Sequence, residues 1–232
     1  MLQVQGLRFA WPRARALTLD IAHLHLAAGR AVFLHGPSGC GKSTLLSLLA
    51  GVLVAGPGQV SLAGQDWAAL APGRRDALRA RDLGVIFQQF NLLPYLSVLD
   101  NVLLPARLSP PRAARCAGGP LVAAQQLLAR VGLPQALWAR RADALSVGQQ
   151  QRAAAARALL GRPPLVIADE PTSAMDAALR DSFMALLMGE CRAAGSTLVF
   201  VSHDERLAGH FDERVSLPSL NRASLAAEGV SA

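Results

Sequence analysis

The sequence predicts an α/β fold built on a largely parallel sheet. Short apolar runs at residues 31–34, 83–87 and 165–168 have the length and composition of strands that are buried on both faces. A helical pattern at 174–194 separates the third run from a further expected strand at 197–201. Strands that alternate with helices are typical of a parallel sheet with helices on both faces, and this is the fold class we expect.

Two other kinds of pattern surround this sheet. Residues 4–9 and 16–26 alternate apolar and polar side chains, and a further strand is expected at 59–63, so we predict an antiparallel β subdomain. Residues 88–151 show helical spacings interrupted by Pro94 and Pro105, which indicates a helical subdomain inserted into the sheet. We therefore expect one domain over 1–232, with a core of 1–87 and 152–232. The last twenty or so residues are expected to form a peripheral tail.

Composition limits the classes of function. The 232 residues are 52% hydrophobic and 17% charged, so the chain can bury a core, and no apolar run reaches the roughly 18 residues that cross a bilayer. No leader pattern follows Met1, and three cysteines without metal-ligand spacing indicate a reducing compartment, so we expect a cytoplasmic protein. The net charge of +7 comes from scattered arginines without interleaved aromatic residues, which favours a basic surface over a nucleic-acid site.

The strongest local motif is the glycine-rich stretch GPSGCGKS at 36–43, which matches the phosphate-binding pattern G-x-x-x-x-G-K-[ST]. Glycines let the backbone wrap around phosphates, so that N–H groups and the start of the following helix face the anion. Lys42 is suited to neutralise the β- and γ-phosphates, and the Ser43 hydroxyl to bind Mg²⁺. The predicted phosphate-binding residues are Gly36, Pro37, Ser38, Gly39, Cys40, Gly41, Lys42, Ser43 and Thr44.

Lys42 is also the only lysine, since every other basic residue among the 23 lysines and arginines is arginine. Lysine is a compact charge on a flexible stem, whereas the guanidinium is a wide planar fork. A narrow phosphate cradle is a place where that difference matters. The bias therefore supports a phosphate-binding role for Lys42.

Polar residues follow three of the predicted strands. Asp169 and Glu170 end the apolar run at 165–168, where Asp169 can hold Mg²⁺ and Glu170 can polarise an attacking water. Gln88 and His203 follow two other strands, which places both along the same sheet edge. Ser146 begins a helix in the stretch LSVGQ at 145–149, where it can act as an N-cap or help to form a second anion-binding helix end.

Together these segments resemble the ATP-binding cassette family over nearly the whole chain. The motifs occur in the family's order: the phosphate loop (Walker A) at 36–44, Gln88 as the Q-loop glutamine, 145–149 as the signature, 165–169 as Walker B, Glu170 as the base, 173–176 as the D-loop, and His203 as the switch histidine. Trp11 matches the aromatic residue that stacks on adenine, although Phe9 is a neighbour and an aromatic residue here can also belong to the core.

The resemblance implies a P-loop ATPase that binds ATP and Mg²⁺ and forms a head-to-tail homodimer. Ser43, Gln88 and Asp169 would contact the metal, and Glu170, His203 and Gln88 would serve hydrolysis. The phosphate loop of one copy and the signature of the other would clamp each ATP. The implied contacts beyond the phosphate loop are Trp11, Ser146, Gly148, Gln149 and Asp176.

Two departures from the family pattern stand out. Val147 replaces the first glycine of the signature, and it would be strained if that backbone needs a positive φ. The run of four alanines at 153–156 is blander than the β-branched mixture usual after the signature. The first departure could weaken ATP-driven closure of the dimer, but we expect it to be tolerated.

The resemblance also implies a partner. The chain has neither a long coiled-coil insert nor a second cassette, so a separate membrane permease is favoured, with the chain peripheral on the inner face of the membrane. Residues 87–102 resemble the cassettes of lipoprotein release, macrolide export and cell division, and less closely those of amino-acid importers. The alternatives are an ATP-gated module that transmits force or signals without moving a solute, and an inactive binding subunit, against which Lys42, Asp169, Glu170 and His203 argue.

Overall fold

The computed structural model describes residues 1–173, 175 and 177–223. A five-stranded parallel sheet has the strand order β6 (Leu83–Ile86), β7 (Leu165–Asp169), β8 (Thr197–Val201), β3 (Ala31–His35) and β9 (Glu213–Ser216). A four-stranded antiparallel sheet has the order β2 (Leu19–Leu26), β1 (Leu2–Phe9), β4 (Val60–Leu62) and β5 (Gln65–Asp66). The fold class predicted from the sequence is confirmed.

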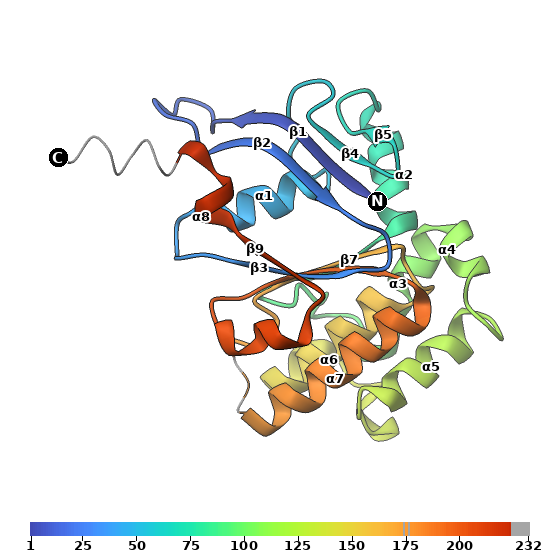
Figure 1. Cartoon of the computed structure of the whole chain (residues 1–232). Helices are drawn as coiled ribbons and strands as arrows, with labels where there is room; N and C mark the ends of the chain where they lie inside the picture. The colour runs from blue at the N-terminus through green and yellow to red at the C-terminus, as the bar shows by residue number, and fades with distance from the viewer. Residues whose placement is uncertain (174, 176, 224–232) are drawn as a thin grey trace.

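The layers follow from which side chains the parallel strands bury. Helix α1 (Lys42–Leu49) lies between the two sheets, and α6 (Val147–Leu159) and α7 (Ala177–Ala194) cover the opposite face of the parallel sheet (Figure 1). Because successive residues of a strand point to opposite faces, Phe33 packs on the side of α6 and α7, while Val32 packs on the side of α1. The central strands therefore need apolar residues at nearly every position, which is the pattern their sequences show.

The remaining helices lie before, within and after the helical insert. They are α2 (Pro72–Asp82), α3 (Val98–Leu108), α4 (Pro110–Ala114) and α5 (Pro120–Arg130), followed later by α8 (Leu217–Leu220), with single 3-10 turns η1 (Gln135–Leu137), η2 (Ala142–Ala144) and η3 (Glu205–His210). Helix α6 is continuous across residue 151, so the expected division between the helical subdomain and the core falls inside it. In the part of the chain that the structure describes, no helix is both long and apolar enough to cross a bilayer.

Two expectations were wrong. Residues 213–216 are not part of a peripheral tail, because β9 pairs in parallel with β3 at the edge of the central sheet. Pro105 does not interrupt a helix, since α3 continues through it. Proline removes only one backbone donor, and Pro105 lies in the last turn, where three further residues complete the helix.

Candidate functional site

The phosphate loop connects β3 to α1 at the carboxyl edge of the parallel sheet. Gly41 is the N-cap of α1 with φ of 101°, a conformation that disfavours other residues, and a Cβ there would lie 2.9 Å from Leu19 Cδ2. No side chain caps α1, so its amino-terminal N–H groups face the loop. Lys42 Nζ donates to the carbonyl oxygens of Gly36 (2.8 Å) and Pro37 (2.9 Å), which holds the ammonium inside the curve of the loop.

The first carboxylate meets the start of α1. Strand β7 ends at Asp169, whose Oδ2 accepts a hydrogen bond of 3.4 Å from the Ser43 hydroxyl. Burial raises the pKa of Asp169, and the neighbouring Glu170 raises it further, while Ser43 and Lys42 act in the opposite direction. A cation placed between Asp169 and Ser43 would oppose both of the effects that raise this pKa.

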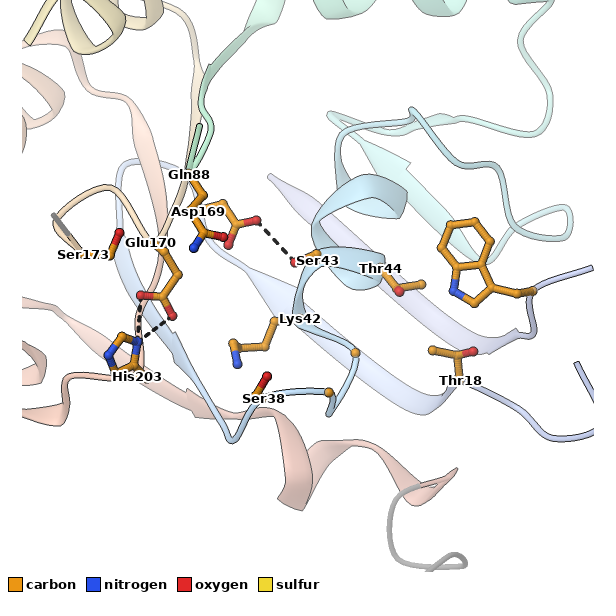
Figure 2. Close-up of a pocket in the computed structure, with 13 residues that line it drawn as sticks. Thr18, Ser38, Lys42, Ser43, Thr44, Gln88, Asp169, Glu170, Ser173 and His203 are labelled. Atoms are coloured by element: carbon orange, nitrogen blue, oxygen red, sulfur yellow. Dashed lines mark hydrogen bonds and ion pairs between the residues drawn. The ribbon is translucent and has the colours of Figure 1, made fainter. Parts of the chain in front are cut away.

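The second carboxylate pairs with the histidine. Glu170 has φ of 47°, a strained conformation for a residue other than glycine, and its N–H donates to the Val201 carbonyl (3.0 Å). This backbone turn directs the carboxylate to His203, whose Nδ1 lies 3.0 Å from both Oε1 and Oε2 (Figure 2). Because a carboxylate only accepts hydrogen bonds, Nδ1 carries the hydrogen in this contact.

These side chains line one cavity of about 520 Å³. Figure 2 shows Lys42 between the Glu170–His203 pair on one side and Ser43 on the other, with Thr18 on the far side of the phosphate loop. Among the predicted residues, those that line the cavity are Trp11, Ser38, Gly39, Gly41, Lys42, Ser43, Thr44, Gln88, Asp169, Glu170 and His203. The structure thus brings together groups from four strand ends, as their positions in the sequence predicted.

Two further lining residues are Thr18 and Ser173. Ser173 had a signal in the sequence, because it belongs to the D-loop stretch that follows the acids, whereas nothing in the pattern around Thr18 marked it. Trp11 packs edge-on against Phe9 (ring centroids 5.6 Å apart, planes at 83°) and remains 47% exposed. An aromatic residue that is half exposed at a cavity mouth is available for stacking and does not belong to the core.

The signature residues lie elsewhere. Ser146 caps α6 by accepting from Gln149 N (3.4 Å), and Gln149 Oε1 accepts from Ser146 N (3.0 Å), so the two form a reciprocal capping box. Val147 is the first residue of α6 and has no positive φ, so the strain considered for this replacement does not arise. Neither Ser146 nor Gly148 lines the cavity of the same chain. Asp176 lies outside the described residues.

A direct link joins the cavity to the helical insert. Gln88 follows β6, and the chain then turns through Phe90 and Asn91, both with positive φ. Arg157, on α6, donates to the carbonyl oxygens of Phe90 and Asn91, each at 2.6 Å. The segment that carries Gln88 is therefore held to α6, the helix that Ser146 caps.

The available donor set fits a hard divalent cation. Ser43, Gln88 and Asp169 all present oxygen atoms at the cavity wall, which is what Mg²⁺ prefers when phosphates and water supply the rest. Over the described residues there is no group of three or more histidine, cysteine, aspartate or glutamate side chains that could hold a metal ion. The oxygen donors of Ser43, Gln88 and Asp169 are therefore of the kind that suits Mg²⁺.

Comparisons with known proteins agree with this geometry. The profile of the family described as ABC transporter matches residues 19–173. The chain belongs to this family. It is 44% identical over 196 residues to the lipoprotein-releasing system ATP-binding protein LolD of Anaeromyxobacter dehalogenans, covering 84% of this chain and 80% of that protein. It is 40% identical over 207 residues to the sulfate/thiosulfate import ATP-binding protein CysA 2 of Chromobacterium violaceum, covering 88% of this chain and 52% of that one.

Among solved structures, the chain resembles the ABC transporter cassette MJ0796, whose dimeric structure superposes with a TM-score of 0.82 at 28% identity, covering 94% of this chain and 95% of that chain. The same cassette is known as a dimer in a post-hydrolysis state bound to ADP and Pi. The predictions of an ATP-binding cassette and of ATPase activity are thus confirmed. The chain is an ATP-binding ATPase subunit of an ABC transporter, a class whose cassettes dimerise and work with membrane partners.

Proposed function

We propose that this chain powers a transporter of the lipoprotein-release and macrolide-export type, acting as a head-to-tail homodimer beneath a separate permease on the inner face of the membrane. The observation that carries the ATPase site is the convergence of Lys42, Glu170 and His203 on one cavity. The transporter type is supported by 44% identity to a LolD protein and by residues 87–102. An import subunit at 40% identity is nearly as close, so identity alone does not decide the direction of transport.

In the proposed site the phosphate loop binds the nucleotide. Lys42 exchanges its two carbonyl acceptors for β- and γ-phosphate oxygens, and the N–H groups at the start of α1 donate to the same anion. Ser43, Asp169 and Gln88 are the residues that would hold Mg²⁺, which neutralises charge on the phosphates when bound. Trp11 stacks on adenine at the exposed side of the cavity.

Hydrolysis is assigned to Glu170 and His203. Glu170 accepts a proton from the attacking water while the water oxygen bonds to the γ-phosphorus and the bond to the ADP oxygen breaks. The hydrogen bond from His203 Nδ1 orients the Glu170 carboxylate. The other ring nitrogen of His203, Nε2, is then left to contact the γ-phosphate. The strained φ of Glu170 is the backbone feature that brings the carboxylate and the histidine together.

The signature residues act in trans under this proposal. Ser146 and Gly148 do not line the cavity of their own chain, yet they lie at the amino terminus of a 13-residue helix. The capping box there pairs the N–H groups of Ser146 and Gln149 and leaves that of Gly148 to face an anion. The Ser146 hydroxyl accepts from Gln149 N and keeps its own hydrogen to donate to a γ-phosphate. Asp176 is proposed to lie at the same interface. Arg157 then couples closure at Ser146 to the segment of Gln88.

Complementation between two inactive variants tests the head-to-tail arrangement. Lys42→Ala chains lose the phosphate loop cation, and Ser146→Arg chains block the signature. In a mixed head-to-tail dimer one site carries both lesions and the other carries neither, so the mixture should bind ATP at one site per dimer and recover hydrolysis that neither variant shows alone. If each site uses Lys42 and Ser146 of the same chain, the mixture should bind and hydrolyse no more ATP than the separate variants.

The permease assignment needs a different measurement. Co-expression with a candidate permease of the lipoprotein-release type, followed by reconstitution in vesicles, should give ATP turnover that rises when a lipoprotein substrate is included. A complex whose ATPase responds to no exported substrate, but whose ATP binding alone changes the activity of an associated enzyme, would contradict transport and favour a signalling module.

A further inference from the structure

The carboxyl-terminal segment reaches the nucleotide cavity because β9 runs parallel to β3. In their pairing His35 lies opposite Ser216, so both strands end side by side. The phosphate loop begins at the next residue of one strand and α8 at the next residue of the other. Figure 1 shows α8 beside α1 and β2, on the phosphate-loop side of the sheet. A segment that sequence patterns placed at the periphery is therefore delivered to the site.

The first contact of α8 is with the start of the phosphate loop. A Cβ added to Gly36 would lie 2.9 Å from Pro218 Cδ, a distance that side-chain atoms do not adopt, and 2.8 Å from Cys40 Sγ. The pyrrolidine ring thus occupies the space beside the first glycine of the loop. Leu217, next to it, is fully buried in the core beneath α1, so the ring cannot move away as a surface side chain would.

The second contact is made by Asn221, which is 1% exposed. Its Nδ2 donates to the Thr18 carbonyl oxygen (3.0 Å), and its Oδ1 accepts from the backbone N–H of Asp20 (2.8 Å). One side chain therefore holds the backbone on both sides of Leu19 across about 200 residues of sequence. Buried amide groups with both ends paired are rigid, because either end left unpaired costs the full desolvation of that group.

The backbone that Asn221 holds is itself part of the cavity. Thr18 lines the cavity, and the same short stretch packs on the phosphate loop, since a Cβ at Gly41 would lie 2.9 Å from Leu19 Cδ2 and 3.5 Å from the Thr18 carbonyl oxygen. Gly41 is the N-cap of α1, so its position sets where the N–H groups of that helix point. A shift of Thr18 would reach both the base side and the phosphate side of the nucleotide.

We infer that Asn221 is a positioning residue for nucleotide binding, which acts through Thr18 and Leu19 on the cavity wall and on Gly41, with Pro218 supporting the other end of the loop. Asn221 lies outside the set that lines the cavity and acts on nucleotide affinity more than on the chemical step. Figure 2 supports this division, because Thr18 lies across the phosphate loop from Glu170 and His203. The inference rests on the proposed assignment of this cavity to the nucleotide.

The test compares Asn221→Asp with Ser219→Ala. Aspartate keeps the acceptor for Asp20 N–H but replaces the donor to the Thr18 carbonyl by a second oxygen, which repels it. Ser219 lies on the same α8 helix, where its hydroxyl donates to Ser216 Oγ (3.2 Å) at the exposed surface, so its loss serves as the matched control. Titration calorimetry with ADP and Mg²⁺ measures binding to one chain without hydrolysis, and thermal unfolding reports whether each variant is folded.

We expect Asn221→Asp to weaken ADP binding about tenfold, the effect of one lost buried hydrogen bond and a displaced wall. Ser219→Ala should stay within about twofold of the parent chain. In steady-state turnover the KM for ATP should rise by a similar factor while kcat changes less than about twofold. A folded Asn221→Asp chain with reduced thermal stability but unchanged ADP affinity would overturn the inference, because that is the result of a purely structural role.

If Asn221→Asp does not fold, the ADP affinity of Pro218→Ala tests the inference instead. Removing the ring beside Gly36 should weaken ADP binding about threefold, and an unchanged affinity in the folded variant would equally overturn the inference. Failure of the proposed function looks different. In that case the parent chain itself would bind no ADP, whatever stands at position 221.

Discussion

Replacement of Arg112 by methionine removes a guanidinium that joins the helical insert to the central sheet. Arg112 lies on α4 and is 2% exposed. It donates to the carbonyl oxygens of Leu160 (2.7 Å) and Ala158 (2.6 Å) at the end of α6, and to those of Ala80 (3.4 Å) and Leu83 near β6. Burial lowers the pKa of Arg112 to about 10, so the side chain remains a cation at neutral pH.

The expected cost follows from the groups left behind. Methionine is apolar and of similar length, so it fills the space but donates nothing to carbonyls that the fold keeps from water. An unpaired buried acceptor costs about 1–3 kcal/mol, and Arg112→Met leaves several carbonyl oxygens without this donor, while the release of a buried charge offsets part of the sum. We therefore expect Arg112→Met to lower the free energy of unfolding by about 4 kcal/mol, a large share of the 5–15 kcal/mol typical of a domain.

Urea unfolding followed by circular dichroism measures this difference. The matched control is Arg107→Met, since Arg107 is about half exposed and pairs with Asp100 at 2.7 Å on the surface of α3. Such a pair contributes less than about 1 kcal/mol. If Arg112→Met unfolded within about 1 kcal/mol of the parent chain, the insert would not depend on this contact and the reasoning would be wrong.

Three other predictions concern the site. Lys42→Arg keeps the charge but not the compact donor, so ATP turnover, measured as released phosphate, should fall by about 100-fold or more. Near-normal turnover would mean that the phosphate loop has room for a guanidinium. Val147→Gly should lower stability by about 0.5 kcal/mol in urea unfolding and leave ATPase activity no higher, since Val147 is unstrained; a clear gain in activity would contradict this. Iodoacetamide at pH 8 should modify the half-buried Cys40, and more slowly when ADP is present. It should not modify Cys116 or Cys191, because burial raises the pKa of both thiols, to about 12 for Cys191. Mass spectrometry shows which thiols react, and rapid labelling of Cys191 would refute the burial argument.

Much of the fold could be predicted because its strands are buried on both faces. The run at 197–201 is apolar from Leu198 onward and buried at every position, which is typical of a central strand in a parallel sheet. Strand β9 gave no comparable signal, since Glu213 and Arg214 begin it and edge strands tolerate charge. Its place depends on the pairing with β3, a contact between residues about 180 positions apart, which local patterns do not encode.

The candidate site was predictable where chemistry is concentrated in short motifs. Asp169 ends a strand, and Lys42, Glu170 and His203 come shortly after strands. A parallel sheet brings such residues to one edge. Thr18 could not be found in this way, because it contributes through its position in the fold. Asn221 is further from any motif, and only the structure shows that it holds the Thr18 backbone.

The central claim is that Glu170 activates water in a site closed by two copies of the chain, and Glu170→Gln tests it most directly. Glutamine keeps the size of the side chain but accepts no proton, so hydrolysis should fall by about 100-fold or more while ATP remains bound. With ATP and Mg²⁺ the variant should elute from gel filtration as a dimer that retains nucleotide, and Lys42→Ala in the same background should abolish that dimer. A Glu170→Gln chain that hydrolyses ATP at the parent rate, or that binds ATP and stays a monomer, would contradict the account.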